Sequence, residues 1–119
     1  QTENAPAAIG PYSQAMVSGG FVFVSGQIPV DPVSGAVTIS DIMLQTEQVM
    51  KNLGAVLKAA GSGFERVVKA TCYLANMEDF DSFNVVYSSY MSSRPARACV
   101  AVKALPKNVL CEVECIAEV

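Results

Sequence analysis

The sequence predicts one α+β domain, in which a mixed sheet of about six strands carries two helices on one face. Apolar residues recur at helical spacing in only two segments, 41–60 and 78–91. Most of the remaining chain consists of runs rich in β-branched residues, separated by glycine and proline turns. A length of 119 residues suits a single hydrophobic core, so we expect one domain over 1–119.

The N-terminal third is predicted to be extended. Residues 1–13 show no sustained period and should form a lead-in segment. The runs 14–18 and 21–25 flank a Gly-Gly dipeptide, which predicts a tight hairpin. A short run at 37–39, beyond a turn-rich stretch, predicts a further strand.

The first helix should span 41–60. Ser40 is available as its N-cap, and Gly61 stands just past its end. Gly54 inside the helix costs about 1 kcal/mol against alanine, a cost that close approach to the sheet would offset.

The C-terminal half alternates between strands and the second helix. The segment 66–75 is predicted to be a central strand because it is rich in β-branched residues. The second helix, 78–91, has acidic residues in its first turn, and Pro95 stops its continuation. The runs 97–103 and 109–119 are the last two strands.

Two helices on one face leave the other face of the sheet uncovered. We expect Val100 and Val102 to face the helices, and Cys99 and Ala101 to face away. Those outward residues are small rather than charged, and the chain is 51% hydrophobic with only 16% charged residues. The sequence therefore predicts that sheet backs meet in an oligomer.

Charge and hydropathy argue against two classes of partner. The net charge is −3 and no run of basic residues occurs, which disfavours a nucleic-acid binder. No stretch approaches the roughly 18 consecutive apolar residues that a membrane span requires. The N-terminal residues lack the pattern of a secretory signal, although a leader removed before Gln1 stays open.

The four cysteines point to a reducing compartment. Cys111 and Cys115 lie four apart on one predicted strand, about 13 Å from each other, and cannot be bridged. We therefore interpret the cysteines as free thiols. Free thiols predict a cytoplasmic location, or a mitochondrial one if a leader was removed. The spacing does not match a four-cysteine zinc site, and the absence of histidine excludes histidine catalysis and histidine-bearing metal sites.

Arg97 and Glu112 are the leading candidates for chemistry. We expect the last two strands to be adjacent and to aim this guanidinium and this carboxylate together. Arg97 is either one half of a structural ion pair with Glu112 or Glu114, or the receiver of a ligand carboxylate. Cys99 shares a face with Arg97 and is more simply a small packed residue than a nucleophile.

Two residues near the N-terminus are weaker candidates. Tyr12 could close a pocket or merely cover the sheet. Gly26 ends a predicted strand, where the missing Cβ serves a turn or lets a ligand approach its N–H.

The chain resembles the RidA/YjgF family of reactive-intermediate deaminases, also described as L-PSP endoribonucleases. The resemblance depends on several motifs in order, which run almost end to end: Asn4 to Gln14, Ser25 to Pro29, Pro95 to Val100, Leu105 to Lys107, and Glu112 to Glu114. It implies a chorismate-mutase-like fold assembled as a homotrimer, with the sheets forming a barrel and the sites in clefts between subunits. The resemblance also implies that no metal or organic cofactor is needed.

The resemblance also implies an activity, the hydrolysis of 2-iminoacids or their enamine tautomers to 2-oxoacids and ammonia. By this resemblance Arg97 would hold the substrate carboxylate, and Glu112 would activate water. Cys99 and the Gly26 N–H would contact the substrate, with Tyr12 and Asn84 lining the cleft. Glu114 then has a structural role.

Two departures and two alternatives accompany the resemblance. Arg94 stands where an aromatic residue is common, after a shortened 90–94 segment, and Cys111 replaces an aliphatic residue. The alternatives are a trimeric carboxylate-binding or chaperone-like protein without turnover, and a ribonuclease or translation inhibitor. The acidic net charge and the absent histidine support the last of these least.

Overall fold

The structure is a computed structural model that describes residues 1–119, and it contains one five-stranded mixed sheet. The strands lie in the order β1-β2-β5-β3-β4, and all neighbours are antiparallel except β3 and β4. Their bounds are β1 Ala15–Ser18, β2 Phe21–Gln27, β3 Val67–Leu74, β4 Ala96–Ala101 and β5 Cys111–Glu118.

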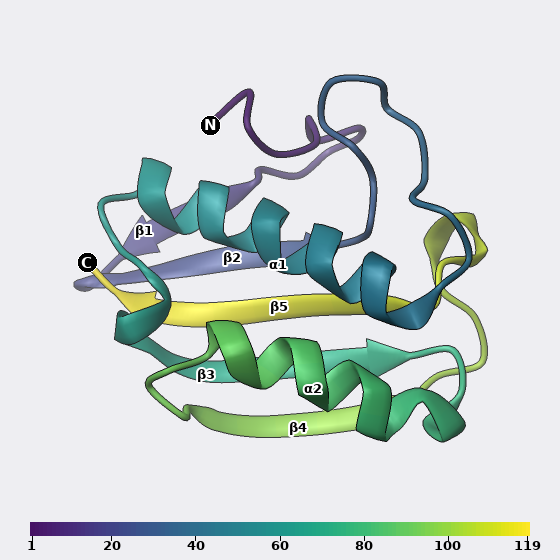
Figure 1. The fold of residues 1–119 in the computed structure, drawn as a ribbon. Coiled ribbons are helices and arrows are strands. Elements are labelled where there is room, and N and C mark those ends of the chain that lie inside the picture. The colour runs from purple at the N-terminus through teal and green to yellow at the C-terminus, as the bar shows by residue number, and fades with distance from the viewer.

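Both helices lie on the same face of the sheet (Figure 1). Helix α1, Ile42–Ala59, packs against β2 and β5, and helix α2, Phe80–Tyr90, forms the crossover between the parallel strands β3 and β4. Three short 3₁₀ turns complete the chain, at Phe64–Arg66, Met77–Asp79 and Pro106–Asn108. The predicted α+β layers, with two helices on one face, are confirmed.

The turn glycines adopt the conformations that their positions require. Gly19 and Gly20 both have positive φ, of 60° and 83°, as a two-residue hairpin connection demands. Gly61 follows α1 with a φ of 81°. Gly54 does allow close packing, as predicted, but the partner differs. A Cβ at this position would lie 2.8 Å from the Phe64 ring, so α1 approaches this ring here and not the sheet.

The prediction of a strand at 37–39 is wrong, so the sheet has five strands rather than six. Val37 forms only an isolated bridge to Val30. Between them, the Asp31 carboxylate accepts hydrogen bonds from the backbone N–H groups of residues 33 and 34, which folds this stretch into a turn. A single bridge does not form the repeated hydrogen-bond pairing that defines a strand.

The helix starts also differ from prediction. Asp41, not Ser40, caps α1, and its Oδ1 accepts from the Leu44 N–H at 3.0 Å. Asn76 accepts from the Glu78 N–H and opens a 3₁₀ turn, so the α-helical part of the second helix begins only at Phe80.

The predicted orientation of β4 is reversed. Cys99 packs against the core under the helices, whereas Val100 is 45% exposed. The register explains the difference, since Cys99 lies beside the buried Cys72 and Val100 beside Tyr73 on the other face. Arg97 therefore lies on the helix side of the sheet.

The face without helices carries exposed apolar side chains, as predicted, together with charged residues of β3 and β5. Met16, Phe21, Phe23 and Val100 are all exposed there by more than a third of their surface. Two polar residues on this face form a hydrogen bond with each other: the Tyr73 hydroxyl donates to Glu114 Oε1 at 2.6 Å. All four cysteines are unbridged, and neither helix has the length and hydropathy to cross a membrane.

Candidate functional site

The guanidinium of Arg97 is held by aromatic rings and an amide. Its Cζ lies 4.7 Å from the centre of the Tyr87 ring and 5.6 Å from that of Phe80. Its Nη1 donates to Asn84 Oδ1 at 2.7 Å. These three partners come from one stripe of α2, with spacings of four and three residues. Because arginine has five N–H donors, several remain for a ligand.

Arg97 lines a cavity of about 640 Å³ between α2 and β4. None of its lining residues is acidic, and the set is Asn84, Tyr87, Ser88, Met91, Ser92, Arg94, Pro95 and Arg97. The Tyr87 hydroxyl is buried and has no hydrogen-bond partner, and burial raises its pKa to about 12. The cavity is thus cationic and suited to an anion.

Cys99 lies on the same face as Arg97, two residues along β4. Burial raises the pKa of its thiol, and the nearby Arg97 charge only partly opposes this. A thiol with a raised pKa is protonated near neutral pH and is a poor nucleophile. Cys99 packs against the core and is not among the residues that line the cavity with Arg97, so its contact with a substrate stays a prediction.

Glu112 lies on β5, on the face without helices. Burial raises the pKa of its carboxyl, and the charge of Glu114 on the same face raises it further. Tyr73, its neighbour on β3, engages Glu114 rather than Glu112. The Glu112 carboxyl is thus half-buried and holds its proton more readily than an exposed glutamate does.

Gly26 brings β2 against Glu112. The register between β2 and β5 shifts between Val24 and Gln27, which marks a β-bulge at this point. A Cβ at position 26 would lie 2.9 Å from Cδ of Glu112 and closer still to its carboxylate oxygen. Glycine is therefore required for the carboxylate to lie here.

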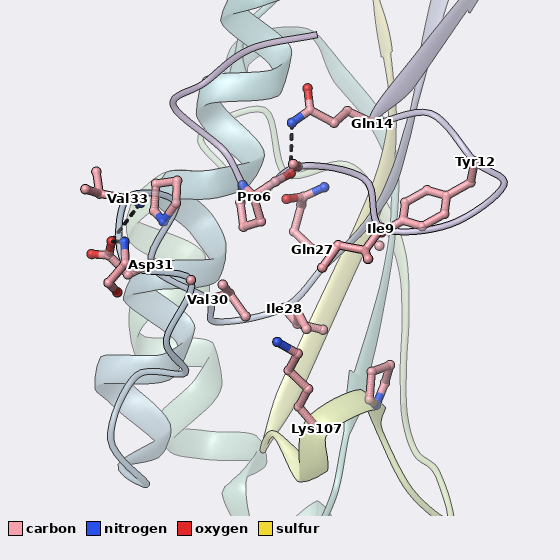
Figure 2. A pocket seen from close by; sticks show the side chains of 16 residues that line it. Pro6, Ile9, Tyr12, Gln14, Gln27, Ile28, Val30, Asp31, Val33 and Lys107 are labelled. Carbon is pink, nitrogen blue, oxygen red and sulfur yellow. Dashed lines mark hydrogen bonds between the residues drawn. The ribbon is translucent and has the colours of Figure 1, made fainter.

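Tyr12 and Gly26 line a second cavity, of about 430 Å³ (Figure 2). The lead-in segment that carries Tyr12 is fixed by the buried Gln14, whose side-chain amide donates to the Pro6 carbonyl at 2.8 Å and accepts from the Thr2 N–H at 2.8 Å. Tyr12 itself is 54% exposed at the edge of this cavity, so it can contact a ligand or a second molecule.

The predicted pairing of Arg97 with Glu112 does not occur within one chain. Strand β3 separates β4 from β5, and the two side chains lie on opposite faces of the sheet. The alternative of a structural ion pair between Arg97 and Glu112 or Glu114 is wrong for the same reason. Instead, the candidate residues fall into two groups, here called half-sites: one contains Arg97, Cys99 and Asn84, and the other contains Glu112, Gly26 and Tyr12.

Sequence reasoning missed the aromatic support of Arg97. Phe80 and Tyr87 were recognisable as parts of the apolar stripe of the second helix, and Asn84 lies between them on the same stripe. Only the placement of β4 beneath α2 shows that this stripe holds a guanidinium. No group of three or more histidine, cysteine or acidic side chains is arranged to bind a metal ion.

Comparison with known proteins identifies the family. The family described as Endoribonuclease L-PSP matches residues 2–119. The chain belongs to this family. This family is the RidA/YjgF family to which the motifs pointed, so the predicted family membership is confirmed.

Relatives in this family carry several names. A RutC family protein of Pyrococcus horikoshii is 52% identical, over 98% of this chain and 93% of its own length. The 2-iminobutanoate/2-iminopropanoate deaminase of Mus musculus is 47% identical, over 98% of this chain and 87% of its own. Among solved structures, E. coli TdcF with bound serine has a TM-score of 0.95 at 38% identity, covering 100% and 96% of the two chains.

The unpartnered hydroxyl of Tyr87 leads to a prediction about stability. Tyr87→Phe removes a buried polar atom that has no hydrogen bond, so the free energy of unfolding should stay unchanged or rise by about 1 kcal/mol. Urea unfolding at a fixed protein concentration measures this. A loss of more than about 1 kcal/mol would show that the hydroxyl has a partner.

Proposed function

We propose that this protein hydrolyses 2-iminoacids and their enamine tautomers, such as 2-iminopropanoate and 2-iminobutanoate, to 2-oxoacids and ammonia. The observation that carries the proposal is the state of Arg97, held by two rings and an amide rather than by a carboxylate. This arrangement leaves the guanidinium available for the carboxylate of a small acid. The name of the mouse relative supports the same reaction.

The proposed chemistry needs few groups. Arg97 binds the substrate carboxylate, and the electrophilic carbon of the imine accepts a water molecule. Glu112 takes a proton from that water as the C–O bond forms and the C=N bond of the protonated imine becomes single, and then delivers this proton to the nitrogen. As the C–N bond breaks, the remaining hydroxyl proton leaves the new carbonyl oxygen and ammonia departs as ammonium. Cys99 and the Gly26 N–H contact the substrate, while Tyr12 and Asn84 line the cleft.

We further propose that each site forms between two copies of the chain in a homotrimer. One chain holds Arg97 and Glu112 on opposite faces of its sheet, so a neighbour must supply the missing half. The exposed apolar face with Met16 and Phe23 supports such an assembly, in which the sheets meet as a barrel.

The first prediction concerns turnover. Added to threonine dehydratase and threonine, the protein should speed the appearance of 2-oxobutanoate beyond spontaneous hydrolysis. Arg97→Lys loses the two-pronged contact, so kcat/KM should fall about tenfold or more. Arg66→Lys, at an exposed position outside both half-sites, is the matched control and should leave the rate unchanged.

The same assay separates the alternative functions. Binding of 2-oxobutanoate in calorimetry, without any acceleration of imine hydrolysis, would favour a carboxylate-binding protein. The family description also names a ribonuclease activity. Cleavage of RNA that survives rigorous purification and is lost in Glu112→Gln would support that activity instead.

The second prediction concerns pH. Because the charge of Glu114 raises the pKa of Glu112, Glu114→Gln should lower that pKa. A general base works when deprotonated, so the acid limb of kcat/KM should move to lower pH. Glu118→Gln removes the same charge from the far end of β5 and should leave the limb in place. An unmoved limb in Glu114→Gln would count against Glu112 as the base.

The third prediction tests the shared site directly. Arg97→Ala and Glu112→Gln subunits should each be nearly inactive alone. When equal amounts are unfolded and refolded together, chance assembly gives about one site in four with both residues intact, so about a quarter of the wild-type activity should return. Mixing without refolding serves as the control. No recovery in verified mixed trimers would overturn the shared site.

A further inference from the structure

The cavity that holds Arg97 contains a second arginine that the proposed reaction does not use. Arg94 lies between α2 and β4 and lines the same 640 Å³ space. Its function is therefore open to inference from the structure.

The backbone holds Arg94 in an unusual conformation. Its φ is 50°, in the left-handed region that few non-glycine residues adopt. Its N–H donates to the Met91 carbonyl at 3.1 Å, and Pro95 follows directly. The turn therefore fixes where the Arg94 side chain leaves the backbone, next to the opening that Ser92 and Ser88 also line.

The two guanidiniums differ in their surroundings. Arg97 is half-buried and engaged by Asn84, Tyr87 and Phe80. The Arg94 side chain is exposed and makes no hydrogen bond within the chain. Since no acidic residue lines the cavity, both positive charges are available to a ligand.

The dimensions suit a ligand with two anionic groups. Residues three apart place their Cα atoms within about 10 Å, and arginine side chains are long enough to meet both ends of a four- or five-carbon diacid. The cavity volume is also within the usual range for small-molecule sites, about 300–1,000 Å³. A single carboxylate on Arg97 would leave Arg94 unused.

We propose that Arg94 is a specificity-determining residue that adapts the site to 2-iminoacids with a second carboxylate, such as the imines of aspartate and glutamate. This inference rests on the proposed function. Arg97 takes the carboxylate next to the imine, and Arg94 takes the distal one. The reaction is unchanged: water adds to the C=N bond, and a 2-oxodiacid and ammonia leave.

The test compares two substrate classes in the full chain. An amino-acid oxidase generates the imines in the assay mixture, from aspartate or glutamate as the diacids and from alanine as the monocarboxylic reference. The rate of 2-oxoacid formation is then measured. Arg94→Gln should lower the ratio of kcat/KM for diacid over monoacid imine about three- to fivefold, as loss of one partly exposed ion pair implies. Arg94→Lys should keep most of the wild-type preference for the diacid imine, because the positive charge is retained. The control variant Arg66→Gln should leave this preference unchanged.

A binding arm keeps the inference separate from the proposed function. Calorimetry compares 2-oxoglutarate with 2-oxobutanoate on wild type and Arg94→Gln, at low and high salt. Tighter binding of the diacid, weakened by salt and lost in Arg94→Gln, supports the role of Arg94 even if no imine is turned over. Turnover of monoacid imines with equal affinity for both acids would overturn the role of Arg94 and leave the deaminase proposal standing.

Discussion

The alternation of side chains across a sheet covered on only one face determines the rest of this structure. Along β5, Cys111, Val113, Cys115 and Ala117 are buried under the helices, and the residues between them point to the other face. That other face carries exposed aromatic and aliphatic side chains together with Glu112. One strand thus builds the core and presents the Glu112 carboxyl on the opposite face.

This alternation keeps the side chains of Arg97 and Glu112 apart. If Arg97 and Glu112 shared a face and a pocket, the guanidinium and the carboxylate would pair, and a ligand would have to displace one of them. On opposite faces, Arg97 is satisfied by Asn84 and two rings, and Glu112 keeps a raised pKa. Within one chain, neither group therefore has the other as an ion-pair partner.

Local features of the sequence predicted most of the fold, and pairing between distant segments accounts for what they missed. The Gly19-Gly20 hairpin and both helices follow from turn chemistry and periodicity. The order β5-β3-β4 does not, because it depends on the crossover through α2. Without that order, the sequence could not predict on which face of the sheet Arg97 and Val100 lie. The motifs indicated candidate site residues, which stay predictions, but not that Arg97 and Glu112 lie on opposite faces of the sheet.

The uncovered face and the divided site impose one further constraint. If neighbouring chains complete the site as proposed, the contact that buries Met16 and Phe23 is also the contact that brings Glu112 toward a neighbour's Arg97. Stability then depends on protein concentration through the same association that creates activity. A substitution that weakens the apolar contact would lower both together, even though it touches neither reactive group. Activity in this fold would therefore be a property of the assembly, while the single chain supplies two prepared halves.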